Sequence, residues 1–391
     1  MDAIGWGTIL LTLLLRFWPV WLALVLTFAV SARYRRRLGL YGRLFDSTIG
    51  MVGFGLVMFW VFTALFSDLI VTHDVLSQIS QMKNKPPGSA VPDGTAWYLL
   101  GGDHLGRDVF SRMVAGSRIV IAIAPLATLF AFMAGITLGL PAGYYGGRLD
   151  TVLSFLANLI LAFPVILLFY LLVTPEIAAT GLPQYLAIVL FLFPLVFLAV
   201  LVNSRYYVTP AFRTKVLAVI LVLGGYIYLA LVGEAGTKVA LLPEAADIIH
   251  VPGNILIVFV SVVFVNAPTV FRIVRGITLD IKTRDYVAAA QTRGERPWYI
   301  MLWEILPNAR GPLIVDFCLR IGYTTILLGT LGFFGLGLSP ESPDWGSTIN
   351  AGRKLLTIAP HPAIVPAIAL MSMVLGLNLL ADGLREESLK D

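Results

Sequence analysis

Long apolar stretches alternate with short polar segments along almost the whole chain. About 20 apolar residues in an α-helix cross the hydrocarbon core of a bilayer. Backbone groups in lipid must form hydrogen bonds within their own segment, and the alternating pattern of strands is missing, so helices are expected throughout. The pattern predicts an all-α polytopic membrane protein. Nine stretches are predicted to be membrane helices, at about 7–30, 49–71, 117–140, 152–173, 184–202, 216–233, 253–271, 311–335 and 363–383.

The first stretch is predicted to be a retained helix and not a cleaved signal peptide. Asp2 and no basic residue precede it, and its apolar run is longer than a signal peptide requires. A basic cluster at 33–37 follows it, as expected for a stop signal. Arg16 interrupts the stretch and is expected to face protein, because a charge in the hydrocarbon core is costly.

Basic residues predict the orientation in the membrane, since Lys and Arg concentrate in cytoplasmic segments. The bias places the N terminus and residues 72–116 outside and the C terminus inside. Most of the 28 Lys and Arg fall in the segments then assigned to the cytoplasm, which are 31–48, 141–151, 203–215, 272–310 and the tail after 383.

Composition agrees with a membrane protein and excludes other classes. Hydrophobic residues make up 58% of the chain and charged residues 13%, whereas about a quarter of the residues of soluble domains are charged. The net charge of +5 is explained by the cytoplasmic bias, so membrane lipid and no nucleic acid is expected as a partner. The one cysteine, Cys318, cannot form an internal disulfide.

A polar and basic loop at 272–310 lies between two apolar stretches. Asp285 is a predicted helix N-cap, and the small residues 288–290 after it are strong helix formers. Gly294 suits the left-handed residue that ends a helix, and Pro297 suits the first turn of the next one. Pro307 is expected to break the chain before it re-enters the membrane. Small side chains would permit close approach by another protein, although composition alone also fits an ordinary basic loop.

A second segment, Leu100–Arg112, precedes the third apolar stretch. Residues 105, 109, 110 and 113 fall on one helical face, which predicts an amphipathic helix at the membrane interface. Asp108 and Arg112 have the i,i+4 spacing of an ion pair. A third segment, Gly332–Gly337, precedes Trp345 and is expected to form tight turns, with Trp345 at the interface.

These three segments resemble the permease subunits of oligopeptide and dipeptide ABC importers. The family has Asp-Tyr-Val-x-Ala-Ala-x-x-x-Gly followed by Leu-Pro-Asn in its cytoplasmic coupling loop, and Ala288 stands where the family's motif has glutamate. It also has Gly-x-Asp-x-Leu-Gly-Arg-Asp-x-x-Ser-Arg outside the membrane, and Phe-Leu-Gly-Leu-Gly before Pro-x-Trp-Gly. The resemblance covers about 95–383. Its positions are Asp285, Ala289, Ala290, Gly294, Leu306 and Pro307 in the loop, and Asp103, Leu105, Gly106, Arg107, Asp108 and Arg112 outside.

The resemblance implies a six-helix permease core with about three additional transmembrane helices. Residues 1–48 would then be an additional helix with a basic cytoplasmic linker, and 49–116 the first core helix with the outside segment and its interfacial helix. Residues 117–391 would complete the core, with an inserted hairpin at 184–233 and the coupling loop at 272–310. The insertion crosses the membrane twice, so it leaves the later orientation unchanged.

The resemblance further implies a subunit of an ATP-driven importer for peptides or peptide-like solutes in the bacterial cytoplasmic membrane. The implied partners are a second permease subunit, two ATPase subunits, and a periplasmic or lipid-anchored solute-binding protein. No cofactor, metal site or catalytic residue is expected in this chain. Consistent with that, Gly236-Thr237-Lys238 lacks the spacing of a phosphate-binding loop, so ATP and Mg²⁺ would be bound by the ATPase subunits.

Other classes of function remain open from the residues alone. A permease of the same family could carry nickel or a sugar-like solute. A secondary transporter would show inverted repeats and ionisable residues near the middle of the membrane, and neither is evident. A membrane enzyme would need a polar cluster within the spans, where Asp316 and Arg320 are the only close pair.

Overall fold

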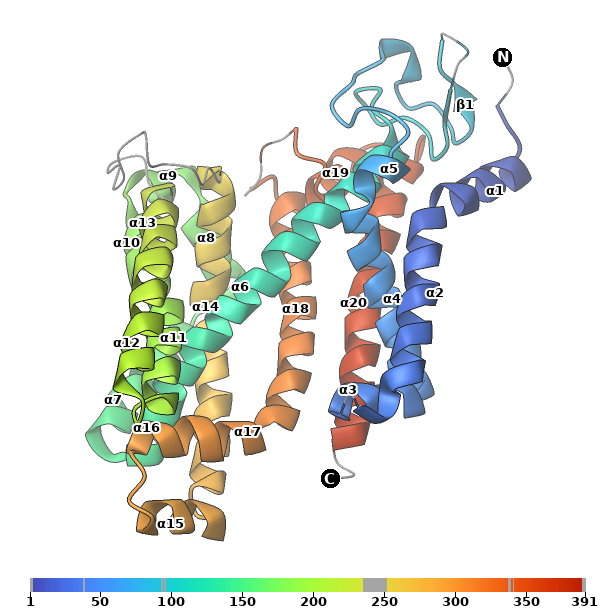
Figure 1. The fold of residues 1–391 in the computed structure, drawn as a ribbon. Helices are drawn as coiled ribbons and strands as arrows, with labels where there is room; N and C mark the ends of the chain where they lie inside the picture. The colour runs from blue at the N-terminus through green and yellow to red at the C-terminus, as the bar shows by residue number, and fades with distance from the viewer. Residues whose placement is uncertain are drawn as a thin grey trace. The chain divides into compact units, whose positions relative to one another are not determined.

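The computed structural model describes residues 3–37, 39–92, 94, 96–234, 252–336, 339 and 341–388, except for the side chains of 40, 234 and 388. This part of the chain is almost wholly helical (Figure 1). It divides into two compact units, Met1–Pro125 with Cys318–Asp391 and Leu126–Phe317. Both boundaries fall inside long helices, α6 (Val109–Tyr145) and α18 (Arg310–Phe333).

The predicted membrane helices are present. Among the described residues, seven helices are long and apolar enough to cross a membrane, and two bent helix pairs raise the number to nine. Each of the nine predicted apolar stretches overlaps one of these helices or pairs. The prediction of an all-α polytopic membrane protein is therefore confirmed.

The first unit combines the two ends of the chain. Its core lies between α4 and α20, where apolar side chains and glycines pack the two helices closely together. The strands pair antiparallel, with Ser89 opposite Tyr98. Besides its parts of α6 and α18, the unit contains α1 (Trp6–Arg16), α2 (Trp18–Tyr34), η1 (Arg35–Arg37), α3 (Gly39–Arg43), η2 (Leu44–Asp46), α4 (Thr48–Leu65), α5 (Ser67–Ile70), η3 (Ser80–Met82), β1 (Ser89–Ala90), β2 (Trp97–Tyr98), α19 (Trp345–Arg353) and α20 (His361–Ser388).

The second unit is built around α14, which packs against α7, α8 and α10. Besides its parts of α6 and α18, it contains α7 (Gly147–Leu161), α8 (Val165–Val173), α9 (Pro175–Ala179), α10 (Leu182–Leu190), α11 (Leu192–Arg205), α12 (Pro210–Val219), the π-helical segment η4 (Ile220–Gly224), α13 (Gly225–Glu234), α14 (Gly253–Ile281), α15 (Asp285–Thr292), α16 (Pro297–Tyr299), the π-helical segment η6 (Ile300–Ile305) and α17 (Leu306–Asn308). The segment 184–233, predicted to be an inserted hairpin, corresponds to α10–α13.

Two of the predicted membrane helices are bent. Helices α1 and α2 meet at 54° around Phe17, and Arg16 is exposed at this bend, so the expectation that Arg16 packs against protein is wrong for this chain. Helices α7 and α8 meet at 81°. Pro164 precedes α8, and a proline disfavours helical geometry in the residue before it, so the helix is interrupted there.

The orientation predicted from the basic residues can be measured directly. Within the second unit, α9 and α15 lie at opposite ends of the bundle (Figure 1). We expect Glu176→Cys, on α9, to react with an impermeant maleimide in intact cells when Cys318 is replaced by alanine. Arg293→Cys should react only after the membrane is opened. Labelling of Arg293→Cys from outside intact cells would reverse the predicted topology.

Candidate functional site

The N-cap of helix α15, in the loop 272–310, lies one residue earlier in the chain than predicted. Arg284 is the N-cap, with φ −77° and ψ 148°, and no side chain caps the helix. Asp285 is the first helical residue, so its predicted role as the N-cap is wrong. Its carboxylate still lies in the first turn, where the helix dipole favours negative charge.

Gly294 ends this short helix as predicted. Its φ is +78°, in the left-handed region that favours glycine. The Gly294 N–H donates to the Gln291 carbonyl at 2.9 Å, and the Glu295 N–H donates to the Ala290 carbonyl at 3.2 Å. This pair of bonds is a Schellman motif, which satisfies the last carbonyls of the helix. The chain can then reverse direction and begin α16.

The small residues of α15 divide between two environments. Ala288 and Ala289 are exposed, whereas Val287 and Ala290 are fully buried. The buried pair joins an apolar cluster beneath the loop, so the expectation that Ala290 itself touches another protein is wrong. Ala289 is left to present a small side chain on the surface. The other buried members of the cluster are Phe132, Leu140, Val270, Val274, Ile281, Ile300, Met301, Leu302, Ile305, Ala309 and Leu313.

The second arm of the loop is a nearly continuous helical run from Pro297 to Asn308. Pro297 occupies its first position, as predicted, and Leu306 packs against the buried cluster beneath α15. Pro307 is exposed and lies near the end of the run, before α18 begins at Arg310. Figure 1 shows α16 and α17 running across the direction of α18. An ion pair of 2.8 Å between Arg293 and Glu304 joins the two arms.

Polar bonds fix the loop to the helices of its own unit. Asp150 on α7 and Arg275 on α14 form a two-bond ion pair, in which Nη2 and Oδ2 lie 2.6 Å apart. The Lys282 ammonium donates to the Gly143 carbonyl at the end of α6, at 2.8 Å. Gln291 donates to the Tyr144 hydroxyl at 3.2 Å. These contacts place α15 at one end of α6, α7 and α14.

The inserted hairpin contacts the same loop, which was not predicted. Trp303 donates through its indole N–H to the Ser204 hydroxyl at 3.0 Å. The Arg205 guanidinium lies 4.8 Å from the centre of the Trp303 ring, and the Arg296 guanidinium lies 4.9 Å from that of Tyr207. We call residues 204–207 with 296–303 the hairpin seam. The aromatic and basic residues of the seam can be read from the sequence. The sequence does not show which of these residues contact one another, because the two segments are about 90 positions apart.

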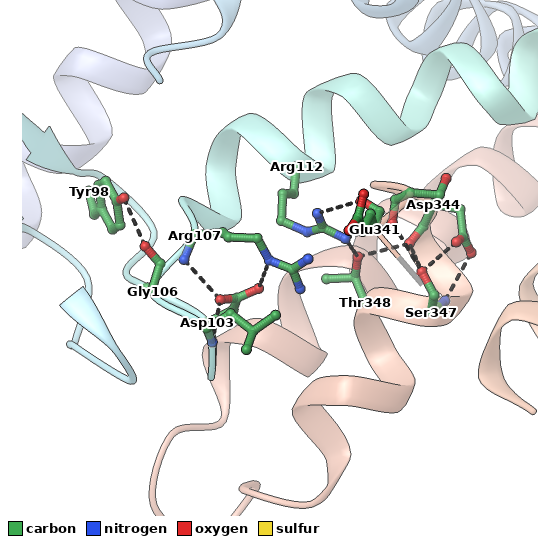
Figure 2. Close-up of polar contacts among 12 residues, drawn as sticks. Tyr98, Asp103, Gly106, Arg107, Arg112, Glu341, Asp344, Ser347 and Thr348 are labelled. Carbon is green, nitrogen blue, oxygen red and sulfur yellow. Dashed lines mark hydrogen bonds and ion pairs between the residues drawn. The ribbon is translucent and has the colours of Figure 1, made fainter. Parts of the chain in front are cut away.

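The signature segment, residues 100–112, folds around one carboxylate. Asp103 accepts backbone N–H bonds from Leu105 and Arg107 at 2.8 and 2.9 Å, and its second oxygen accepts from Arg107 Nε at 2.7 Å. Gly106 has φ +81° and makes the tight turn possible. The Tyr98 hydroxyl donates to the Gly106 carbonyl (Figure 2), and burial with the nearby carboxylates of Asp108 and Asp103 raises the pKa of Tyr98 to about 12.

Asp108 directly precedes α6 and does not pair with Arg112. It accepts from the Ser111 N–H at 3.1 Å and from the Thr72 hydroxyl at 2.9 Å, as a helix N-cap. The predicted i,i+4 pair is therefore wrong. The predicted interfacial helix is wrong too, because Leu105 lies in the turn and α6 runs without interruption from Val109 into the membrane span.

Arg112 ties α6 to the segment before α19, and Figure 2 shows its guanidinium directed at this segment. The side chain is 1% exposed and donates to the carbonyls of Glu341 and Ser342 at 3.2 and 2.7 Å. Asp344 caps α19 through the Ser347 N–H at 2.9 Å, and burial raises the pKa of its carboxyl. Trp345 is buried and donates to the Met113 carbonyl, so its predicted place at the membrane interface is wrong.

The structure thus brings the predicted site residues together in two groups, one in each unit. The loop residues form two helical arms over an apolar cluster, with the small residues Ala288 and Ala289 exposed on the first arm. The signature residues form a buried polar turn at the start of α6. A polytopic helical protein with a polar loop of two helical arms is the architecture expected of a membrane component of a transport system.

Comparison with known proteins identifies the family. Residues 135–386 match the family of binding-protein-dependent transport system inner membrane components, and the chain belongs to it. The chain is 30% identical over 331 residues to the glutathione transport system permease protein GsiD of Pectobacterium atrosepticum, covering 84% of this chain and 83% of that protein. It is 25% identical over 346 residues to the dipeptide transport system permease protein DppC of Alkalihalophilus pseudofirmus, covering 88% and 87%.

Family membership confirms the class predicted from the three motifs. The chain is a multi-pass inner-membrane permease subunit of an ABC importer. Importers of this family combine such a subunit with ATPases and a solute-binding protein.

Proposed function

We propose that the chain forms part of the pathway for peptides or peptide-like solutes and couples that pathway to ATP hydrolysis. The named activities of the relatives, glutathione and dipeptide transport, support this solute class. A second permease subunit would complete the pathway, two ATPase subunits would bind the loops 272–310, and a periplasmic or lipid-anchored protein would deliver the solute. This chain would carry out no covalent chemistry, and ATP and Mg²⁺ would be bound by the ATPases.

The exposed face of α15 carries this proposal. Ala289 presents a small side chain on a helix that is fixed from below by Val287 and Ala290. An ATPase surface could approach such a helix closely without displacing side chains. A push on α15 would reach α18 through the Arg293–Glu304 ion pair and the second arm. Closure of the ATPases would move the loops and open the pathway outward. After ATP hydrolysis, the pathway would release the solute inward.

A large side chain on the exposed face of α15 should impair ATPase binding without impairing folding of the permease. We expect Ala289→Trp to leave the level of folded permease unchanged and to lower the amount of co-purified ATPase at least tenfold, because the indole would hold the two surfaces apart. Ala179→Trp is the matched control, since Ala179 is an exposed alanine of α9 in the same unit. Ala290→Trp should instead lower the level of folded permease, because the Ala290 side chain is fully buried.

Quantitative co-purification at matched membrane levels is the measurement. Equal ATPase recovery with Ala289→Trp and Ala179→Trp would show that α15 is ordinary connecting chain. Solute uptake that persists without any ATPase would favour a secondary transporter.

A further inference from the structure

A cavity of about 320 Å³ lies in the first unit, between the signature segment and α19. Its polar lining comes from two stretches of chain that are more than 200 residues apart. Leu105, Leu336 and Ala351 supply an apolar part of the wall. The polar lining residues are His104, Arg107, Arg112, Ser347, Asn350 and Lys354.

The cavity carries an excess of positive charge. Arg107 and Arg112 are 3% and 1% exposed, and Lys354 lies at the surface. Asp103 offsets one guanidinium through Arg107 Nε. The carboxyl group of Asp344 is held by the lining residue Ser347, and its burial raises its pKa and so disfavours its charged form. A cation would be repelled from such a site, and an anion would be attracted.

Arg107, which lines the cavity, also has free hydrogen-bond donors. Arg107 uses Nε for Asp103, and its two terminal nitrogens form no hydrogen bond or ion pair within the described part of the chain (Figure 2). Arg112 Nε and His104 Nδ1 are enclosed atoms without a hydrogen-bond partner in the same part of the chain. An oxygen-bearing anion in the cavity could accept hydrogen bonds from the two terminal nitrogens of Arg107.

We propose that this cavity binds a carboxylate of the transported solute, such as the C-terminal carboxylate of a peptide. The planar fork of Arg107 fits two carboxylate oxygens. A cavity of about 300 Å³ is at the small end of ligand sites, so it would hold the terminal residue and not a whole peptide. The assignment rests on the proposed peptide transport, and it gives the signature segment a role in selecting solutes.

Two substitutions change the charge of the cavity with little change in shape. Asn350→Asp places a carboxylate at the wall and keeps the oxygen that accepts from Arg353 Nε at 2.9 Å. Lys354→Gln removes a rim charge. The matched controls are Gln78→Glu and Lys83→Gln. They make the same charge changes at exposed positions of this unit that do not line the cavity.

Binding is measured calorimetrically on the full-length chain, with the subunits that co-purify with it, in phosphatidylcholine nanodiscs. The probes are trialanine and its C-terminal amide. We expect the amide to bind about tenfold more weakly than the acid, the size of one charge-assisted hydrogen bond. Asn350→Asp and Lys354→Gln should weaken binding of the acid by a similar factor and leave binding of the amide unchanged. The controls should bind both probes with wild-type affinity.

Three outcomes would overturn the assignment. If the acid and the amide bind with equal affinity, or if the variants and the controls bind the acid with equal affinity, the cavity does not recognise the carboxylate. Inorganic phosphate that binds in place of trialanine, or phosphatidylglycerol that binds and is lost in both variants, would assign the site to a phosphate or a lipid headgroup. Weaker recovery of the solute-binding protein with unchanged trialanine affinity would make the cavity a docking contact. Failure of the proposed transport would show separately, as absent uptake of trialanine by wild-type cells.

Discussion

Gly139→Leu is expected to abolish most of the folded permease. Gly135, Gly139 and Gly143 are four residues apart on α6 and face α14 within the second unit. A Cβ atom added at Gly139 would lie 2.9 Å from Val274 Cβ and 3.0 Å from the Phe271 carbonyl oxygen. Membrane helices approach closely through such small residues, and overpacking a tight contact costs about 3 kcal/mol.

The matched control is Gly225→Leu, because an added Cβ atom at Gly225 on α13 meets no atom within 4 Å. Both variants place the same apolar side chain in a helix of the same unit. We expect only Gly139→Leu to lower the thermal midpoint and the membrane level, as measured by fluorescence-detected size-exclusion chromatography. Similar losses in both variants would show that the contact between α6 and α14 does not limit stability.

Gly294→Val is expected to abolish transport-linked ATP hydrolysis while the permease remains inserted. A β-branched residue is strained at φ +78°, and an added Cβ atom meets no atom within 4 Å beyond the adjacent residues, so backbone strain is the expected effect within this chain. The strain would distort the Schellman turn that sets α15 against α16, and the added volume would meet the ATPase. We expect loss of ATPase co-purification at matched membrane levels.

Gly181→Val tests whether strain alone explains that result. Gly181 has φ +83° and lies before α10 in the same unit, remote in sequence from the loop. It should suffer the same local strain and keep ATPase association. Loss of ATPase in both variants would mean that the permease tolerates no strained turn, and it would leave the coupling role of Gly294 unsupported.

The sequence predicted the features that depend on local patterns. Apolar stretches located the nine membrane segments, and the glycine four positions after Ala290 located the end of α15. The spacing of Gly135, Gly139 and Gly143 is also visible in the sequence, although periodicity alone does not say which helix it faces. Such features can be predicted because backbone conformation and burial in lipid act over a few residues at a time.

Several predictions failed, or could not be made, because they depend on residues that are distant in the chain. Arg112 could not be assigned, because its acceptors Glu341 and Ser342 are 229 and 230 positions away. The burial of Ala290 could not be told from the exposure of Ala289, since both are alanine on a helix of eight residues. The excess charge of the cavity likewise becomes visible only when Arg107 and Lys354 are brought to one wall.

Through the hairpin seam, a movement of helices α10–α13 in the bilayer would reach the loop 272–310. Apolar side chains at Val219, Leu221 and Val222 are more than half exposed in this chain, so lipid would act on α12 and η4 directly. Membrane helices tilt when the bilayer thickness changes. Any tilt of the hairpin that moves Ser204 or Arg205 must either carry Trp303 with it or break the seam. The activity of the transporter would then depend on the thickness of the membrane around it, even at constant concentrations of solute and ATP.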